Sequence, residues 1–237
     1  MSAPKKTDLT IVIPALNESE IIAMTLDEVK RVLEKARISH QIIVVDDASI
    51  DGTGLVAGEH GADVVVKTKH TVGKGAAIRL GASKASGSII VTLDADGAYN
   101  PMDIGKLLAP ILEGRADLVI GSRLIPYHEK FMSKFGSILI SIILRFCLGI
   151  EFFDIWSGLK AYRANILHSL LKYPLSSGHL FDSEIAILAK ERGYRVSEIP
   201  VRIRLRESFG YSRSKFVVGL RNFLSLYTII IHLGKYG

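Results

Sequence analysis

The feature of this sequence that most constrains its fold is a regular alternation of short apolar runs with helical patterns between residues 9 and 120. Residues 9–14 are rich in β-branched side chains and predict a buried strand, and residues 20–36 carry apolar side chains at helical spacing. Strands that alternate with helices over short loops are typical of a parallel sheet covered by helices on both faces. We therefore predict an α/β fold with a mostly parallel sheet.

The same patterns place the remaining elements. Further strands are predicted over residues 41–45, 62–67, 88–93, 117–120 and 196–204. Further helices are predicted over residues 51–60, 75–86, 103–113 and 183–192. Because ligands bind at the carboxyl ends of the strands in sheets of this kind, polar clusters that directly follow a strand are candidate site residues.

The size and composition indicate a single folded domain. With 237 residues, 48% of them hydrophobic, the chain can bury a sizeable core, and disorder is excluded. No internal repeat or linker divides it, so we predict a catalytic domain over residues 1–215 followed by an amphipathic helix over residues 216–237. The single cysteine, Cys147, excludes an internal disulfide. A formal charge of +6 suits a phosphate-rich partner such as a nucleotide, an anionic lipid or a nucleic acid.

Two apolar stretches bear on membrane contact. Residues 135–149 are interrupted by Arg145 and residues 216–233 by Arg221, so each falls at or below the roughly 18–20 uncharged residues that a spanning helix needs. The first belongs to a predicted amphipathic helix over residues 130–148, whose basic side chains can reach lipid headgroups. We predict that both helices lie in the plane of a membrane surface; the alternative is that they pack on the protein's own core.

Three acidic clusters follow predicted strands. The first, at residues 14–18, reads Pro-Ala-Leu-Asn-Glu, and by itself it is also explained as a helix start capped by Asn17 or Ser19. The second, at residues 45–53, contains two adjacent aspartates. A solvated turn explains one or two such acids, but two together repel each other and favour a cation or a hydroxyl-rich ligand nearby.

The third cluster reads Asp-Ala-Asp-Gly over residues 94–97. An Asp-x-Asp sequence is common, but carboxylates two residues apart on an irregular turn can both reach one hard divalent ion. Mg²⁺ and Mn²⁺ take one or two protein carboxylates and fill their other positions with substrate phosphates and water. We therefore predict that Asp94 and Asp96 hold Mg²⁺ or Mn²⁺.

Taken in order, these three clusters resemble the signature of the family-2 glycosyltransferases, which have the Rossmann-like α/β fold called GT-A. The resemblance runs from about residue 9 to residue 215. Within the family, the chain is most similar to the dolichyl-phosphate mannose and glucose synthases and their bacterial polyprenyl-phosphate relatives. Five later segments carry that finer likeness: residues 73–75, 121–123, 154–163, 181–185 and a basic loop from Arg206 to Lys215.

The resemblance implies a nucleotide-sugar donor, a metal ion and a lipid phosphate acceptor. Asp96, which would share the metal with Asp94, is implied to act in catalysis with Arg123, Arg206 and Lys215, the three cations binding the acceptor phosphate. Unlike a sugar hydroxyl, an anionic phosphate needs no general base. The residues implied at the nucleotide-sugar are Pro14, Leu16, Glu18, Val45, Asp47, Lys74, Asp94, Ala95 and Asp96.

Two departures from the family pattern affect the details. Many mannose synthases follow Asp-x-Asp with Leu-Gln-His-Pro, whose glutamine also helps to hold the metal, whereas residues 97–101 here read Gly-Ala-Tyr-Asn-Pro. This form resembles the glucose-type synthases, so UDP-glucose is favoured while GDP-mannose stays open. The basic loop is also longer, and we prefer Arg206 to Arg204 or Arg213 as the residue that meets phosphate.

The sequence therefore predicts an inverting, metal-dependent hexosyltransferase of protein glycosylation, acting on dolichyl or polyprenyl phosphate as a peripheral or monotopic protein at the cytoplasmic face of a membrane. A nucleic-acid partner is not expected, because three acidic strand ends would repel a phosphate backbone. One alternative is a family-2 enzyme with a soluble acceptor, for which Asp182 or Glu184 could be the general base. A nucleotide-sugar pyrophosphorylase would need a glycine-rich basic loop at residues 14–18. This sequence reads Pro-Ala-Leu-Asn-Glu there, which argues against that alternative.

Overall fold

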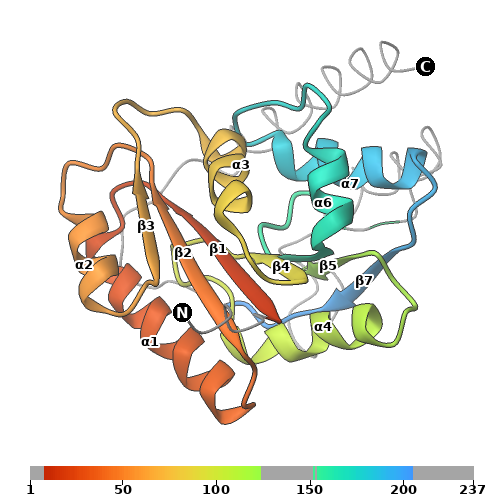
Figure 1. The fold of residues 1–237 in the computed structure, drawn as a ribbon, viewed down its shortest axis with the longest axis horizontal. Coiled ribbons are helices and arrows are strands. Elements are labelled where there is room, and N and C mark those ends of the chain that lie inside the picture. Colours follow the sequence, from red (N-terminus) through yellow and green to blue (C-terminus); the bar gives the residue numbers. More distant parts are fainter. Residues whose placement is uncertain (1–7, 124–151, 153, 205–237) are drawn as a thin grey trace, which may run out of the picture.

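Seven strands of the described chain form one sheet, in the order β3-β2-β1-β4-β6-β5-β7. Figure 1 labels these strands except β6. The computed structural model describes residues 8–123, 152 and 154–204. Neighbouring strands are parallel except where β6 pairs with β4 and β5, so the sheet is mostly parallel, as predicted. The strands are β1 (Leu9–Ala15), β2 (His40–Asp46), β3 (Val64–Lys67), β4 (Ile89–Thr92), β5 (Leu118–Ser122), β6 (Lys160–Arg163) and β7 (Val196–Pro200).

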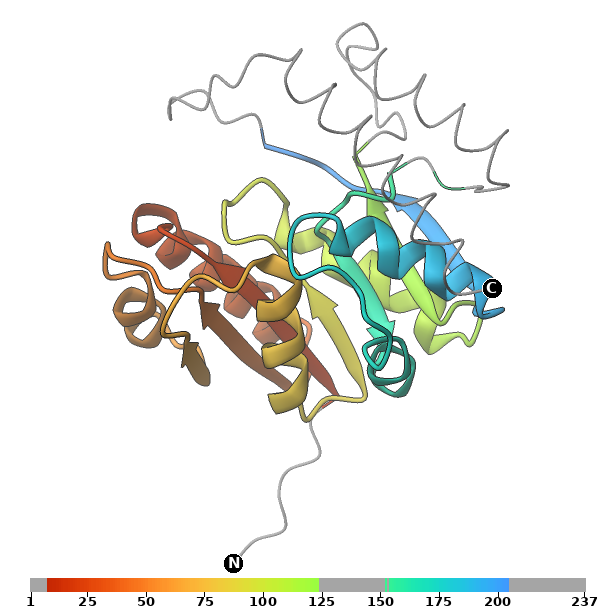
Figure 2. The same ribbon diagram turned by 90° about the horizontal axis from the view of Figure 1, so that it is seen from above.

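Helices cover both faces of the sheet (Figures 1 and 2). The alternation of side chains along β1 separates the faces, because Ile11 and Ile13 pack with α1 and α4 whereas Val12 packs with α3 and α7. The first face carries α1 (Ser19–Lys35), α2 (Thr53–Glu59), the 3-10 helix η1 (Pro101–Asp103) and α4 (Ile104–Leu112). The second carries α3 (Lys74–Lys84), α6 (Ala164–Leu170) and α7 (Phe181–Glu191).

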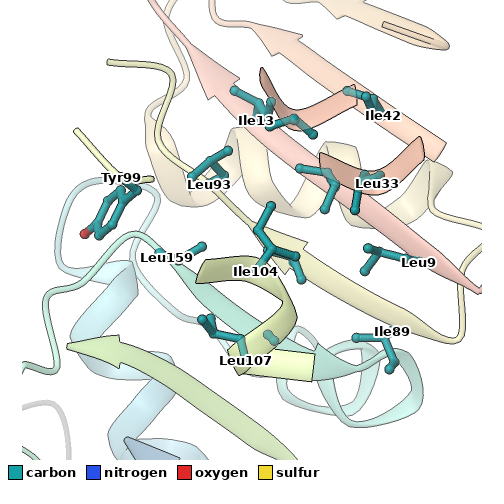
Figure 3. Close-up of a cluster of buried hydrophobic side chains, with 14 of the residues drawn as sticks. Leu9, Ile13, Leu33, Ile42, Ile89, Leu93, Tyr99, Ile104, Leu107 and Leu159 are labelled. Atoms are coloured by element: carbon teal, nitrogen blue, oxygen red, sulfur yellow. The ribbon is translucent and has the colours of Figure 1, made fainter. Parts of the chain in front are cut away.

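One core cluster fills the space between the sheet and the helices α1 and α4 (Figure 3). The buried residues of α1 recur every three or four positions and so share one face of the helix. Figure 3 shows Leu33 of this helix in the same cluster as Ile13 of β1 and Ile104 of α4. Full burial of one such side chain stabilises the fold by about 1.5–3 kcal/mol. This packing makes the sheet a rigid base for the loops at its edge.

The elements predicted between residues 9 and 120 are all present, with ends that differ from the prediction by at most two residues. For example, α2 begins at Thr53 because Asp51 Oδ1 accepts a hydrogen bond from the backbone N–H of Thr53 at 3.0 Å. The strand predicted over residues 196–204 ends earlier, at Pro200. The chain beyond it turns to the loop after β4, where the backbone N–H of Arg204 donates to the carbonyl of Ala98 at 2.8 Å.

The strand β6 and the helix α6 are not predicted by the apolar patterns. β6 reads Lys-Ala-Tyr-Arg, which lacks the apolar run of a central strand, yet it lies between β4 and β5 with Lys160 fully buried. α6 is only 7 residues long, too short to show a helical repeat. Both elements owe their place to contacts with distant parts of the chain.

The predicted amphipathic helices at residues 130–148 and 216–237 lie outside the described residues, as does the domain boundary at residue 215. Within the part that the structure describes, no helix is both long enough and apolar enough to cross a membrane.

Candidate active site

The acidic clusters gather at one edge of the sheet. Ala15 at the end of β1 pairs with Asp46 at the end of β2, and β4 runs parallel beside β1. These three strands therefore end at the same edge, and each acidic cluster follows one of them. β5 and β7 also end there, and the antiparallel β6 begins there with Lys160.

Hydrogen bonds tie the loops of the first two clusters together. Asn17 has a positive φ of 55°, and its Oδ1 accepts from the backbone N–H of Ile50 at 3.0 Å. Asp51 Oδ2 accepts from the backbone N–H of Ser19 at 3.0 Å. The N-cap residue of α1 is Glu18, and its side chain makes no capping bond. A helix does begin directly after the first cluster, at Ser19, but the prediction that Asn17 or Ser19 caps it is wrong, because these residues bind the neighbouring loop.

Asp47 holds the loop that leads into α3. Its carboxylate oxygens accept from the backbone N–H groups of Val72 at 2.7 Å and Gly73 at 2.9 Å, and Oδ1 also accepts from Thr68 Oγ1 at 3.1 Å. A carboxylate has about four acceptor positions, so these bonds use most of its capacity. Asp47 thus has a loop-holding task that the sequence does not indicate, and this task fixes the backbone next to Lys74.

The third cluster lies on an irregular turn after β4. Asp94 and Asp96 are both partly exposed, while Ala95 between them is buried in the core. Asp96 Oδ1 accepts from the backbone N–H of Ala98 at 3.0 Å, which closes the turn. Gly158, in the loop before β6, lies directly against Asp94, since a Cβ at position 158 would overlap the Asp94 carboxylate. The glycine is therefore needed for this carboxylate to occupy its place.

Lys74 connects the turn to α7. Its ammonium nitrogen lies 2.6 Å from Asp94 Oδ1 and 2.6 Å from Asp182 Oδ2. Asp182 Oδ1 lies 3.5 Å from the ammonium nitrogen of Lys160, whose side chain is fully buried. Four charged groups of alternating sign therefore run from the partly exposed Asp94 into the interior.

Burial and neighbouring charges shift the pKa values in this row. Burial alone would lower the pKa of Lys74, but Asp182 and Asp94 outweigh it and raise the pKa above its usual range. Burial also opposes ionisation of Asp182, yet Lys74 and Lys160 hold its pKa below the usual value. For Lys160, burial prevails and lowers the pKa in spite of Asp182. Asp182 is therefore a carboxylate bound by cations, and a weak proton acceptor.

Arg123, which follows β5, forms a bidentate ion pair with Asp154. Its Nε and Nη2 donate to the two carboxylate oxygens at 2.8 Å and 2.9 Å, and its backbone N–H donates to Oδ2 at 2.9 Å. The buried Asp154 is held in turn, because its backbone N–H donates to Glu198 Oε1 of β7 at 2.7 Å. A bidentate pair fixes the plane of the guanidinium. The Arg123 side chain remains 36% exposed.

Three residues that organise this edge have no predicted role. The Tyr99 hydroxyl lies 3.1 Å from Ser157 Oγ and accepts from the backbone N–H of Gly158 at 2.9 Å. Ser157 Oγ donates to the carbonyl of Gly121 at 2.6 Å, which joins the loop before β6 to β5. The segment 154–163, which resembles the family, is the sequence signal for Ser157 and Gly158. Hydrophobic periodicity does not predict where any residue of this segment lies in the fold.

The structure brings most of the predicted site residues to this edge. Val45 and Ala95 are buried in the hydrophobic core, so they shape the floor beneath the loops. Asp47 is also buried, at 4% exposed. Arg206 and Lys215 lie outside the described residues. The predicted residues that are at least partly exposed are Pro14, Leu16, Glu18, Lys74, Asp94, Asp96 and Arg123.

The carboxylates of the turn after β4 fit a hard divalent ion. Among residues 8–123, 152 and 154–204, no three His, Cys, Asp or Glu side chains converge on one metal position. Asp94 and Asp96 supply two carboxylates from one turn. That number matches Mg²⁺ and Mn²⁺ sites in which substrate phosphates and water complete the coordination. Metal binding by these two residues stays a prediction.

Comparison with solved structures supports the fold. The chain is similar to mannosyl-3-phosphoglycerate synthase from Rubrobacter xylanophilus, with a TM-score of 0.74 and 21% identity over 97% of this chain and 75% of that one. It is also similar to glucosyl-3-phosphoglycerate synthase from Mycobacterium tuberculosis in complex with Mn²⁺, uridine diphosphate and glucosyl-3-phosphoglycerate. That match has a TM-score of 0.72 and 22% identity over 94% and 80% of the two chains.

Comparison of sequences shows the family. An uncharacterized protein of Methanocaldococcus jannaschii is 30% identical over 95% of this chain and 92% of its own. Polyprenol monophosphomannose synthase of Mycolicibacterium smegmatis is 32% identical over 83% and 77% of the two chains. Undecaprenyl-phosphate mannosyltransferase of Micrococcus luteus is 32% identical over 88% of each. The model of glycosyl transferase family 2 matches residues 10–171. The chain is therefore a glycosyltransferase and belongs to glycosyl transferase family 2.

Proposed function

We propose that this glycosyltransferase transfers a hexose from UDP-glucose or GDP-mannose to a dolichyl or polyprenyl phosphate. The reaction would invert the anomeric carbon and use Mg²⁺ or Mn²⁺. The enzyme would act as a peripheral or monotopic protein at the cytoplasmic face of a membrane, which holds the lipid chain of the acceptor. The structural observation that supports this acceptor is the pairing of Asp182 with two lysines.

A hydroxyl acceptor needs a general base, and a phosphate does not. Asp182 and Glu184 are the candidate bases. Asp182 is flanked by Lys74 at 2.6 Å and Lys160 at 3.5 Å, and although burial opposes it, these cations hold its pKa below the usual value. Glu184 is 7% exposed, and its Oε2 accepts from the backbone N–H of Ser176 at 2.6 Å. Both carboxylates are thus engaged, which favours an acceptor that requires no base.

The named relatives support the same acceptor class. One is a polyprenol monophosphomannose synthase and the other an undecaprenyl-phosphate mannosyltransferase, each 32% identical to this chain. Both names specify mannose, whereas the Asp-Ala-Asp-Gly sequence at residues 94–97 resembles the glucose-type synthases. The donor sugar is therefore a question for experiment, with both donors tried in parallel.

At the donor, each residue class has a task that suits its chemistry. Glu18 would accept hydrogen bonds from the nucleoside, since carboxylates are good acceptors for ribose hydroxyls and base N–H groups. Asp47, whose bonds to the loop before α3 use most of its acceptor capacity, would contribute only its remaining acceptor position. Lys74 would donate to the diphosphate. Asp94 and Asp96 would hold the divalent ion, which supplies positive charge beside the leaving diphosphate.

At the acceptor, cations would hold one phosphate close to another. Arg123, with its guanidinium plane fixed by Asp154, would act together with Arg206 and Lys215 of the basic loop. Their charges would offset the repulsion between the acceptor phosphate and the donor diphosphate. An acceptor oxygen would then form a bond to the anomeric carbon as the bond to the diphosphate breaks on the opposite side.

The test uses purified protein, Mg²⁺ or Mn²⁺, and a polyprenyl phosphate in detergent, with labelled UDP-glucose and GDP-mannose in parallel. We expect metal-dependent transfer of label to the organic phase from one donor. The variant Arg206→Ala should mainly weaken use of the lipid phosphate, raising its KM. Metal-dependent donor binding without transfer of label from either donor would contradict the proposed reaction and indicate another sugar or a soluble acceptor.

A second candidate is transfer to a soluble phosphorylated acceptor. It is favoured by the structural similarity to synthases of glucosyl-3-phosphoglycerate and mannosyl-3-phosphoglycerate. An added arm of the same assay contains 3-phosphoglycerate in place of the lipid. Label in an anionic, water-soluble product would support this candidate, whereas label found only with the lipid arm would reject it.

A further inference from the structure

Lys74 is fixed between two carboxylates that differ in their surroundings. Its ammonium nitrogen lies 2.6 Å from an oxygen of each, Asp94 and Asp182. The Asp182 side chain is 3% exposed and the Asp94 side chain 26% exposed. A ligand that approaches this edge of the sheet can therefore reach Asp94 much more easily than Asp182.

The contact with Asp182 is supported from behind. The other oxygen of Asp182 lies 3.5 Å from the ammonium nitrogen of Lys160, which also donates to the carbonyls of Ile155 and Ser157. Removing Lys74 from Asp182 would leave a buried carboxylate with less compensation, which is costly. The Lys74–Asp182 contact is therefore the durable one of the pair.

The backbone around Lys74 is also held in place. Gly73 has a φ of 92°, its N–H donates to Asp47 Oδ2 at 2.9 Å, and a Cβ there would come within 2.6 Å of the Ser177 carbonyl. The N–H of Gly75 donates to the same carbonyl at 2.7 Å. Since both flanking residues are fixed, the ammonium group can change partners by a small rotation of its side chain, without movement of the loop.

The Asp94 carboxylate, which contacts Lys74, is also one of the two carboxylates that fit a divalent ion. We propose that Lys74 and the metal ion compete for Asp94, and that Lys74, held by Asp182, moves from Asp94 to the donor diphosphate when the metal–nucleotide complex binds. This inference rests on the proposed metal-dependent binding of the donor. Lys74 would then oppose binding of the bare ion and favour binding of the ion with its nucleotide.

The test measures Mn²⁺ binding by electron paramagnetic resonance on protein stripped with EDTA, without nucleotide and then with UDP or GDP. For Lys74→Met we expect Mn²⁺ alone to bind more tightly and the Mn²⁺–nucleotide complex more weakly, each by on the order of tenfold, or about 1.4 kcal/mol. A merely structural role of Lys74 would weaken both. The opposite signs of the two changes therefore distinguish partner exchange from loss of structure.

The matched control is Lys67→Met, which removes a positive charge 3.6 Å from Asp46 at the end of β2. Lys67 is 62% exposed, so its removal should change Mn²⁺ affinity by less than about twofold. If Lys74→Met does not fold, Lys74→Gln carries the same expectation, because it removes the charge and keeps a hydrogen-bond donor for Asp182.

Equal or weaker binding of Mn²⁺ alone by the folded Lys74 variant would overturn the inference and leave the proposed function intact. A wild-type protein that binds neither Mn²⁺ nor either nucleotide would reject the metal-dependent donor site itself. These two failures are distinguished by the wild-type titration alone.

Discussion

Asp182 Oδ1 lies 3.5 Å from the ammonium nitrogen of Lys160, and neither side chain is more than 3% exposed. The variant Asp182→Ala would leave two cations, Lys74 and Lys160, without their shared carboxylate. We expect it to lower the free energy of unfolding by about 3–5 kcal/mol, as measured by urea denaturation, because a buried charge without a partner is strongly unfavourable. The double variant Asp182→Leu, Lys160→Met should recover part of that loss.

The control for this prediction is the exposed pair of Arg115 and Glu113, whose side chains are 63% and 54% exposed. Arg115→Ala should cost less than about 1 kcal/mol. Similar losses for Asp182→Ala and Arg115→Ala would show that the buried row of charges does not contribute to stability.

Asp96 can lose its charge without losing the bond that closes its turn. Its Oδ1 accepts from the backbone N–H of Ala98 at 3.0 Å, and the amide oxygen of asparagine can accept the same bond. We expect Asp96→Asn to keep the melting temperature and to lose at least about 10²-fold of the transfer rate, because the metal loses a charged ligand. Asp96→Ala should lose activity similarly and stability as well. Normal transfer by a folded Asp96→Asn protein would reject the proposed metal site.

The variant Gly158→Ala tests whether metal binding depends on the position of the Asp94 carboxylate. A Cβ at residue 158 would overlap that carboxylate, so Gly158→Ala should push Asp94 aside and weaken Mn²⁺ binding. We expect a loss of at least about tenfold in affinity, since a shift of about 1 Å at a catalytic group is strongly felt. Gly105→Ala in the exposed part of α4 is the control, because a Cβ there has no atom within 4 Å. It should raise stability by about 0.5–1 kcal/mol and leave Mn²⁺ binding unchanged. Equal Mn²⁺ affinity in both variants would contradict the prediction.

We predict that the protein loses stability at high pH because the buried Tyr99 hydroxyl ionises there. Burial is the main cause that raises its pKa from 10.0 to about 12. A raised pKa in the folded state means that the folded protein holds more protons than the unfolded chain in this interval. The stabilisation is therefore fully present below pH 10 and is lost as the pH rises to about 12, by ~2–3 kcal/mol.

The measurement compares the free energies of unfolding of wild type and Tyr99→Phe across that interval. At neutral pH the variant should be less stable by about 1–3 kcal/mol, since the buried N–H of Gly158 loses its acceptor. The difference between the two proteins should shrink as the pH approaches about 12. Parallel curves would show that Tyr99 does not titrate in this interval.

The sequence predicts the first half of the fold well because local patterns dominate there. The apolar run of β1 and the repeat of buried residues in α1 are each readable without knowledge of the rest of the chain. The edge where the acidic clusters meet also follows from the parallel order of the strands. The prediction of a metal site at Asp94 and Asp96 also needs only the turn that contains them, and it stays a prediction.

The second half is not readable in the same way because its residues depend on distant partners. Lysine is rarely buried, so nothing local predicts that Lys160 lies in a central strand. It is accommodated by Asp182 of α7, 22 positions away in the chain. Arg123 is likewise predicted only to bind the acceptor phosphate. Nothing local indicates its pairing with Asp154, 31 positions away in the chain. Such long-range ion pairs leave no periodic signal in a single sequence.

The reversed strand β6 has a consequence for the order in which this protein can fold. β4 and β5 are synthesised first, but they are not neighbours, because β6 inserts between them and pairs Ile89 with Arg163. A nascent chain that has emerged only as far as Ser122 already contains all three acidic clusters, yet its β4 has one unpaired edge and its β5 has neither of its two partners, β6 and β7. Closing such distant pairs is slow compared with local contacts. Such an intermediate therefore has the three strands that align the acidic clusters before it has Gly158 and Asp182, which contact Asp94 and Lys74 in the complete fold.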